Sequence, residues 1–259
     1  MNKVFQYSFI DLLRSRWTLI YFLFFALANG GLLYLNGGNV KVVISLMNIV
    51  ILLVPLVSMI YGLMYMYQVR DYVEIMLAQP ISRRSIFMGY FLGLSLSLSL
   101  SAMLGLLLPL LILFPSQLSQ GAWWVLVLVA VLLTVIFAGL ACLLVLKHDN
   151  RLKGFGLGLL LWLVLAVLYD GVFLVMLMAF QEYPLEKMAL GFTLFNPIDM
   201  GRILLIFQMD YSAMMGYTGA VFEKFLGTLW GAVVISISFL AWVSLPVWFM
   251  LRRAAGKDF

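Results

Sequence analysis

Six long apolar runs divide this chain, and they limit what it can fold into more than any other feature. A helix needs about 20 mostly apolar residues to cross about 30 Å of hydrocarbon. The runs cover residues 17–35, 42–67, 86–114, 122–146, 154–180 and 225–250. Only the stretch 94–101 alternates strictly, between leucine and serine, so the pattern does not predict a membrane β-barrel. The sequence therefore predicts six transmembrane helices.

Composition excludes the other classes of protein. Apolar residues make up 65% of the 259 and charged residues only 10%, whereas soluble domains have about 45–50% and about 25%. Disorder is excluded because it needs low hydrophobicity and high charge. The single Cys142 excludes a disulfide framework within the chain, and the single His148 excludes a multi-histidine metal site. We expect an all-α polytopic membrane protein in which residues 1–259 form one transmembrane domain.

The distribution of basic residues predicts the orientation. If the N-terminus is cytosolic, only four of the sixteen lysines and arginines fall in outer segments, namely Lys41, Lys187, Arg202 and Lys224. Cytosolic loops carry the excess of Lys and Arg in membrane proteins. Both termini are therefore expected in the cytosol, which agrees with an even number of spans.

Residues 1–16 predict an interfacial helix in the boundary between lipid and water. Apolar side chains at helical spacing form one face and polar side chains the other. The apolar face holds Phe5, Phe9, Leu12 and Leu13, and the polar face holds Lys3, Tyr7, Asp11 and Arg14.

The inner segment 67–85 predicts a short cytosolic helix followed by a sharp turn. Its apolar positions recur at helical spacing, at Val69, Tyr72, Val73 and Met76. Arg70 and Glu74 are four residues apart and can pair on the opposite face. Pro80 ends the helix, and Ser82 can cap the next one. Topology alone does not need a structured helix with a proline stop, so we interpret the segment as a docking surface for a cytosolic partner.

The outer segment 181–224 is the longest piece outside the spans. Asn196 suits a helix cap, Pro197 the first helical position and Asp199 the first turn, with Arg202 three residues further on. These residues predict a short helix that packs at the membrane surface or re-enters it, where it can also hold an external partner. The alternative is a lid that only covers the outer ends of the bundle. The second inner loop, 147–153, is short and basic, and we interpret it as a membrane anchor first and a partner contact second.

Two further features lie inside the spans. Small residues recur every four positions in the third span, at Gly89, Gly93, Ser97, Ser101 and Gly105. Such a stripe favours close helix packing, within the bundle or across a dimer seam. Asp170 is the only acid inside a long apolar run, which makes it a candidate for transport or partner binding. The alternative is an acid that reaches the outer interface.

Catalytic and metal chemistry find little support in the pattern. The chain has no paired acid and base, no ordered Ser/His/Asp set and no GxxxxGK[ST] motif, so any ATP that drives it must bind another chain. The sixteen methionines suggest Cu(I), to which Met209, Met214 and Met215 outside the spans could contribute. Most of the other methionines lie in spans, where methionine is an ordinary apolar filler, so metal handling by this chain is the weaker interpretation.

The order of these segments resembles the permease of a type-2 ABC exporter. That resemblance implies six spans, an interfacial N-terminal helix, a cytosolic coupling helix and a long outer segment. The stretch from Arg70 to Arg84 is similar to the family's acidic-Leu-Pro-Arg coupling segment. The residues that the resemblance assigns to ATPase coupling are Arg70, Glu74, Met76, Leu77, Pro80, Arg83 and Arg84.

A narrower resemblance rests on Tyr169-Asp170, Phe195-Asn196-Pro197-Ile198-Asp199 and Arg202, which look like the NosY-type permeases. These serve the maturation of periplasmic nitrous oxide reductase, a copper enzyme, and move a sulfur-containing species. The coupling segment departs from that family, because Gln68-Val69-Arg70-Asp71 stands where a more acidic, Gly-containing run is common.

The resemblance implies a homodimeric, non-enzymatic permease in a bacterial inner membrane, driven by two copies of a separate cytosolic ATPase. ATP and Mg would bind that ATPase, this chain would hold no cofactor, and a periplasmic protein would sit on the outer segment; no nucleic acid is expected. Asp170, Asn196, Pro197, Asp199 and Arg202 are then the candidates for translocation or for the outer partner. The alternatives are a type-2 exporter of lipid, glycan or drug, and a secondary transporter or intramembrane enzyme built around Asp170.

Overall fold

The computed structural model describes residues 2–37, 40–77, 82–179, 191–209 and 229–256. All regular secondary structure in these ranges is helical, and six of the helices are long and apolar enough to cross a membrane. The prediction of an all-α, multi-pass membrane protein is confirmed at this level. The interfacial placement of the N-terminal helix and the membrane depth of the outer helix stay predictions.

The helices follow the predicted runs closely. The spanning helices are α2 (Arg16–Asn36), α3 (Val40–Gln68), α5 (Arg83–Leu113), α6 (Gly121–Lys147), the composite of α7 (Arg151–Leu163), η2 (Val164–Leu168) and α8 (Tyr169–Ala179), and α12 (Leu229–Gly256). Shorter helices are α1 (Asn2–Leu13), α4 (Arg70–Leu77), η1 (Pro115–Ser119) and α10 (Pro197–Gln208). The fifth span is interrupted, because η2 is a single π-helical turn.

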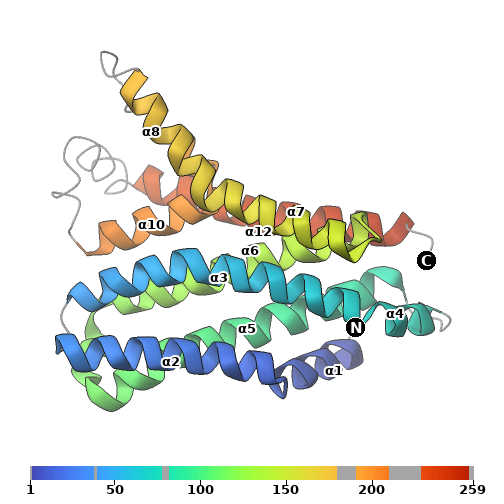
Figure 1. Cartoon of the computed structure of the whole chain (residues 1–259), viewed down its shortest axis with the longest axis horizontal. Coiled ribbons are helices and arrows are strands. Elements are labelled where there is room, and N and C mark those ends of the chain that lie inside the picture. The colour runs from blue at the N-terminus through green and yellow to red at the C-terminus, as the bar shows by residue number, and fades with distance from the viewer. Residues whose placement is uncertain (1, 38–39, 78–81, 180–190, 210–228, 257–259) are drawn as a thin grey trace.

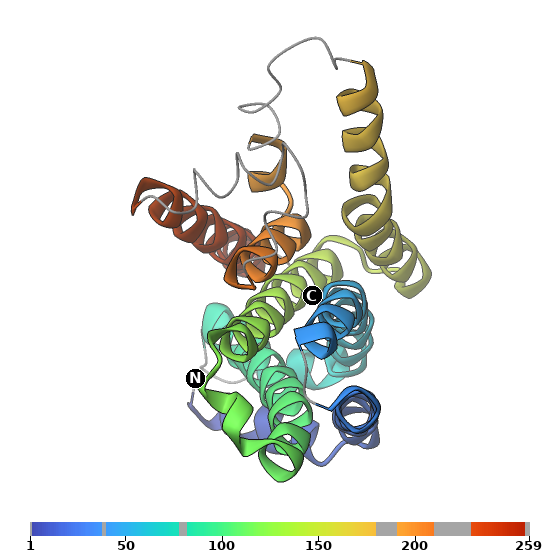
Figure 2. The same ribbon diagram turned by 90° about the vertical axis from the view of Figure 1, so that its left-hand side faces the viewer.

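The core is built around α6. In its most apolar 18-residue window 67% of the residues are buried, against 6% for the fifth span and 22% for α12. Trp123 and Phe137 of α6 are fully buried, and α3 and α5 pack beside them. Figures 1 and 2 show α2, α3, α5 and α6 as one bundle, from which α8 and α12 diverge on either side of α10. The fifth and sixth spans are therefore the least buried of the six spans.

The small-residue stripe of α5 lies against α1 and α2 of the same chain. A Cβ added to Gly89 would meet Val4 at 3.0 Å, and one added to Gly105 would meet Phe25 at 2.8 Å. Between these positions, the Ser97 hydroxyl donates to the Phe9 carbonyl oxygen at 3.3 Å. Residue numbers on α5 and on the facing helices rise together from contact to contact. Helix α1 and then α2 therefore run alongside α5 in the same direction. The stripe thus serves packing within the bundle.

Helix α1 packs one side against the bundle. Its buried stripe is Val4, Ser8 and Leu12, whereas Leu13 is 41% exposed. Ser8 faces Gly93, where the absence of a side chain lets the two backbones approach. Close backbone approach, rather than hydrophobicity alone, sets the rotation of α1.

One end of the molecule gathers the start of α1, α4, the loop between α6 and α7, and the end of α12 (Figure 1). We call this the α4 end. The opposite α10 end carries η1 and α10. This arrangement agrees with an even number of spans.

Candidate functional site

The corner between α3 and α4 is bonded to the loop between α6 and α7. The Tyr67 hydroxyl donates to the His148 carbonyl oxygen at 2.7 Å. Arg70 Nη2 lies 2.9 Å from Asp149 Oδ1, and Arg151 Nη2 donates to the Tyr67 carbonyl oxygen at 3.4 Å. These bonds join the second span to the start of the fifth span. We call this set the inner corner.

The start of α7 is itself fixed by two local features. The Asn150 side chain accepts from the backbone N–H of Leu152 at 2.9 Å and of Lys153 at 3.4 Å, so it caps the helix. The Tyr67 hydroxyl occupies the space that a Cβ on Gly154 would need. One turn later Gly158 lies against Leu63 and Met59 of α3 in the same way. The fifth span therefore docks on α3 through small residues near the α4 end.

Helix α4 forms where the sequence predicts it, and its two sides differ sharply. Val69, which directly precedes α4, is buried with 5% of its surface exposed, and Val73 is buried with 2% exposed. Tyr72 and Ile75 on the other side are 57% and 66% exposed. Tyr72 was expected on the apolar face with Val73, but it points outward. One side of α4 is therefore packed on the bundle, and the other presents Tyr72 and Ile75 at the surface.

The remaining residues assigned to coupling lie around this helix. Met76 Sδ accepts from the Tyr90 hydroxyl at 3.9 Å, and Leu77 is half-buried at the helix end. Arg83 is half-buried and Arg84 exposed in the first turn of α5. Pro80 and the side chain of Glu74, with its expected pairing to Arg70, lie outside the described residues.

The predicted capping bond of Ser82 is absent. Ser82 does precede α5 in extended conformation, but its hydroxyl donates to the Ser85 hydroxyl at 2.7 Å. The Ser82 hydroxyl is bonded to the Ser85 hydroxyl and not to a backbone N–H, so Ser82 does not cap the first turn of α5.

At the α10 end, one arginine binds two acids from different helices. Arg202 Nη1 lies 2.8 Å from Asp170 Oδ2 in α8 and 3.1 Å from Asp199 Oδ1 in α10. The Arg202 and Asp170 side chains are about one third exposed, whereas that of Asp199 is 12% exposed. This set, with Asn196, joins the fifth span to α10. We call it the outer clasp.

Asn196 completes the outer clasp with three hydrogen bonds. Its Oδ1 accepts from the Ile198 N–H at 3.1 Å, which caps α10 as predicted. Its Nδ2 donates to Asp199 Oδ2 and to the Leu165 carbonyl oxygen, each at 2.8 Å. Asn196 is fully buried, so these bonds satisfy an amide that would be costly to leave unpaired.

The bond to Leu165 depends on the π-helical turn. In a regular α-helix the Leu165 carbonyl would accept the Tyr169 N–H, but that N–H donates to Val164 instead. The widened turn thus leaves the Leu165 carbonyl oxygen without a helical partner, and the Asn196 amide donates to it. Such turns are rare and frequently lie at functional sites.

The environment of Asp199 raises its pKa. Burial is the main cause, and the nearby Asp170 carboxylate adds to it, while Arg202 and the Asn196 amide oppose it. The net effect raises the pKa of Asp199 from 3.8 to about 7. The outer clasp therefore contains a carboxyl group that changes charge near neutral pH.

Sequence reasoning identified every side chain of the outer clasp but missed half of the inner corner. Tyr67 and Asp149 were not singled out, although Asp149 is the one acid in an otherwise basic loop. Gly154 and Gly158 have the same four-residue spacing as the stripe in α5, and that spacing was the available signal for their packing role.

The described residues contain no group of three or more His, Cys, Asp or Glu that could hold a metal ion. Of the three methionines considered for Cu(I), Met214 and Met215 lie outside those residues. No protein-family model and no curated protein matches this chain. The function must therefore be argued from the inner corner, the outer clasp and the helix that joins them.

Proposed function

We propose that this chain is the membrane-spanning permease subunit of an ATP-driven exporter, moved by a separate cytosolic ATPase that docks on α4. The observation that carries the proposal is the two-sided character of α4. Val69 and Val73 fix it to the bundle, and Tyr72 and Ile75 remain exposed for a partner. A short helix held in this way can transmit a push without bending.

The bonded contacts supply a path for that push. Arg70 passes it to Asp149 and hence to the start of α7. The fifth span carries it to Asp170, which binds Arg202 in α10. Because this span is the least buried one, it can move with less loss of packing than α6. Motion at α4 would thus reach the α10 end.

The resemblance noted above extends the proposal to partners and cargo. The assembly would contain two permeases and two ATPase subunits, with ATP and Mg on the ATPase. It would serve nitrous oxide reductase by exporting a sulfur-containing species, and the outer segment would hold a periplasmic protein. A nitrous oxide reductase gene beside that of this chain would support the extension, and its absence would leave a general type-2 exporter as the proposal.

The secondary-transporter alternative receives less support. A proton or ion carrier built around Asp170 needs a carboxylate that can release its partner during transport. Asp170 already has a guanidinium at 2.8 Å, and the same arginine also binds Asp199. This geometry favours a structural link over an ion site.

The test replaces the exposed face of α4 in the reconstituted complex. Ile75→Asp removes an exposed apolar contact without touching the buried side of the helix, so the chain should fold while ATPase binding falls at least tenfold. Leu35→Asp is the matched control, because Leu35 is 79% exposed on α2 near the α10 end, far from α4. Pull-down of the ATPase and its ATP turnover are the measurements. Normal assembly and turnover with Ile75→Asp would contradict the proposal.

A further inference from the structure

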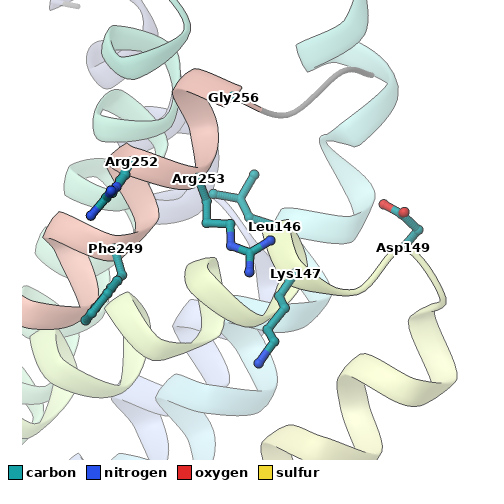
Figure 3. Close-up of a pocket in the computed structure, with 7 residues that line it drawn as sticks. All are labelled: Leu146, Lys147, Asp149, Phe249, Arg252, Arg253 and Gly256. Atoms are coloured by element: carbon teal, nitrogen blue, oxygen red, sulfur yellow. The ribbon is translucent and has the colours of Figure 1, made fainter.

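A cavity of about 620 Å³ lies between the ends of α6 and α12 at the α4 end. Lys147 of α6 and Arg252 and Arg253 of α12 line it, together with Phe249. Figure 3 shows Lys147 and Arg253 extending into it from different helices. Its volume is in the range of small-ligand sites in proteins.

The described lining residues of the cavity carry net positive charge. None of its three cations makes an ion pair with another described residue. Asp149 is the only acid among the described lining residues, and its carboxylate is 2.9 Å from Arg70. The two helix ends add about half a negative charge each, which offsets only part of the three positive charges. An anion is therefore the ligand that this cavity suits.

The cavity also lies where two apolar spans end. Residues 229–251 of α12 contain no charged residue, and Arg252 and Arg253 follow directly. Trp248 and Phe249 are 51% and 46% exposed one turn earlier, and the Arg252 guanidinium lies 5.4 Å from the Trp248 ring centroid. Exposed aromatics followed by cations are typical of the interface between lipid and water. The anion is thus one found at headgroup level.

We propose that this cavity binds the phosphate of an anionic phospholipid. Lys147 and Arg253 contact the phosphate from two helices, and Phe249 and Trp248 lie beside the first acyl carbons. Basic pockets between transmembrane helices suit acidic headgroups for this reason. Only 22% of the residues in the apolar stretch of α12 are buried by protein. The bound lipid therefore also joins α12 to α6.

The experiment measures lipid retention by the full chain. The purified chain in detergent receives equal amounts of phosphatidylglycerol and phosphatidylcholine, and native mass spectrometry counts the bound lipid. We expect preferential retention of phosphatidylglycerol and a loss of about tenfold or more in Lys147→Gln/Arg253→Gln. Lys41→Gln/Arg84→Gln is the control, because it removes the same charge from exposed cations outside the cavity.

Three results would overturn the proposal: equal retention of phosphatidylcholine, an equal loss in the control variant, or displacement of the lipid by millimolar inorganic phosphate. The last result would assign the cavity to a soluble anion. If the double glutamine variant is unstable, Lys147→Arg/Arg253→Lys decides, because it keeps both charges. Retention by that variant supports the lipid site, and loss contradicts it.

Discussion

Asn196 performs three tasks with one short side chain. It caps α10, orients Asp199 and occupies the carbonyl that the π-helical turn frees at Leu165. A fully buried amide can do this only where each partner lies within hydrogen-bond distance, because an unmet donor or acceptor would cost about 1–3 kcal/mol. The polar groups of the outer clasp therefore position one another.

The raised pKa of Asp199 predicts that the stability of the folded chain depends on pH. Its pKa is raised from 3.8 to about 7 in the folded chain, so the folded state binds a proton more tightly than the unfolded state between these values. The stability that this proton provides is complete below about pH 4 and is lost as the pH rises through about 7. We expect the thermal midpoint in detergent to fall over this window, and to fall less in Asp199→Asn.

The control for this measurement is Asp71→Asn, since Asp71 is an exposed acid at the start of α4. It should follow the unmodified chain at every pH. Identical slopes in Asp199→Asn and the unmodified chain would show that another group causes the pH dependence.

At the scale of helices, the fifth span is bonded at its two ends and near its middle, where Trp162 Nε1 donates to the Leu52 carbonyl oxygen at 3.2 Å and Asn196 donates to the Leu165 carbonyl oxygen. Near the α4 end Gly154 and Gly158 let it approach α3, and near the α10 end Asp170 binds Arg202. The π-helical turn lies between these two attachments. A kink in the fifth span would lie at this turn, because the hydrogen-bond ladder is already interrupted there.

Two glycines of α7 offer a matched pair of substitutions. Gly154→Ala would place a Cβ against the Tyr67 hydroxyl, whereas a Cβ at Gly156 meets no atom within 4 Å. We expect Gly154→Ala to destabilise the chain by about 1–3 kcal/mol through overpacking. Gly156→Ala should be neutral or stabilising by up to about 1 kcal/mol through helix propensity. Thermal unfolding in detergent measures both, and a neutral Gly154→Ala would mean that α7 does not dock on α3 as described.

At the scale of the molecule, two ion pairs join the α4 end to the α10 end through the fifth span. In the Arg70–Asp149 pair, the arginine side chain is 26% exposed and the aspartate side chain 66% exposed. Because solvent screens such a pair, it contributes only about 0–1 kcal/mol to stability. Its value to the protein would then be mechanical, since it joins α4 to the helix that carries Asp170.

The difference between stability and coupling gives a third prediction. Asp149→Asn should change the free energy of unfolding by less than about 1 kcal/mol. In the reconstituted complex, however, it should abolish the ATP-dependent signal of a fluorophore on Gln208→Cys at the end of α10. Cys142 is buried, so background labelling should be low. Arg70→Gln should have the same effect, and the double variant should add nothing.

Asp11→Asn serves as the control for that experiment, because Asp11 is an exposed acid on α1. An ATP-dependent signal that survives in Asp149→Asn would exclude this ion pair from the path between the two ends.

The sequence by itself determined the six spans, the short helix after the second span and the start of α10. Each of these depends on neighbouring residues: about 20 consecutive apolar side chains, helical spacing over two turns, and an Asn-Pro cap. The Asp199–Arg202 pair belongs to the same class, because three positions along a helix place two side chains on one face.

Only the tertiary structure decided which partners the other polar groups take. Arg70 bonds to Asp149 79 positions away, and Asp170 bonds to Arg202 32 positions away. Likewise, Ser8 rather than a larger apolar residue faces α5, because Gly93 lets the backbones meet there. Local periodicity fixes which residues form a helix, but the rotation of that helix and its long-range bonds follow from the shapes of the surfaces that pack together.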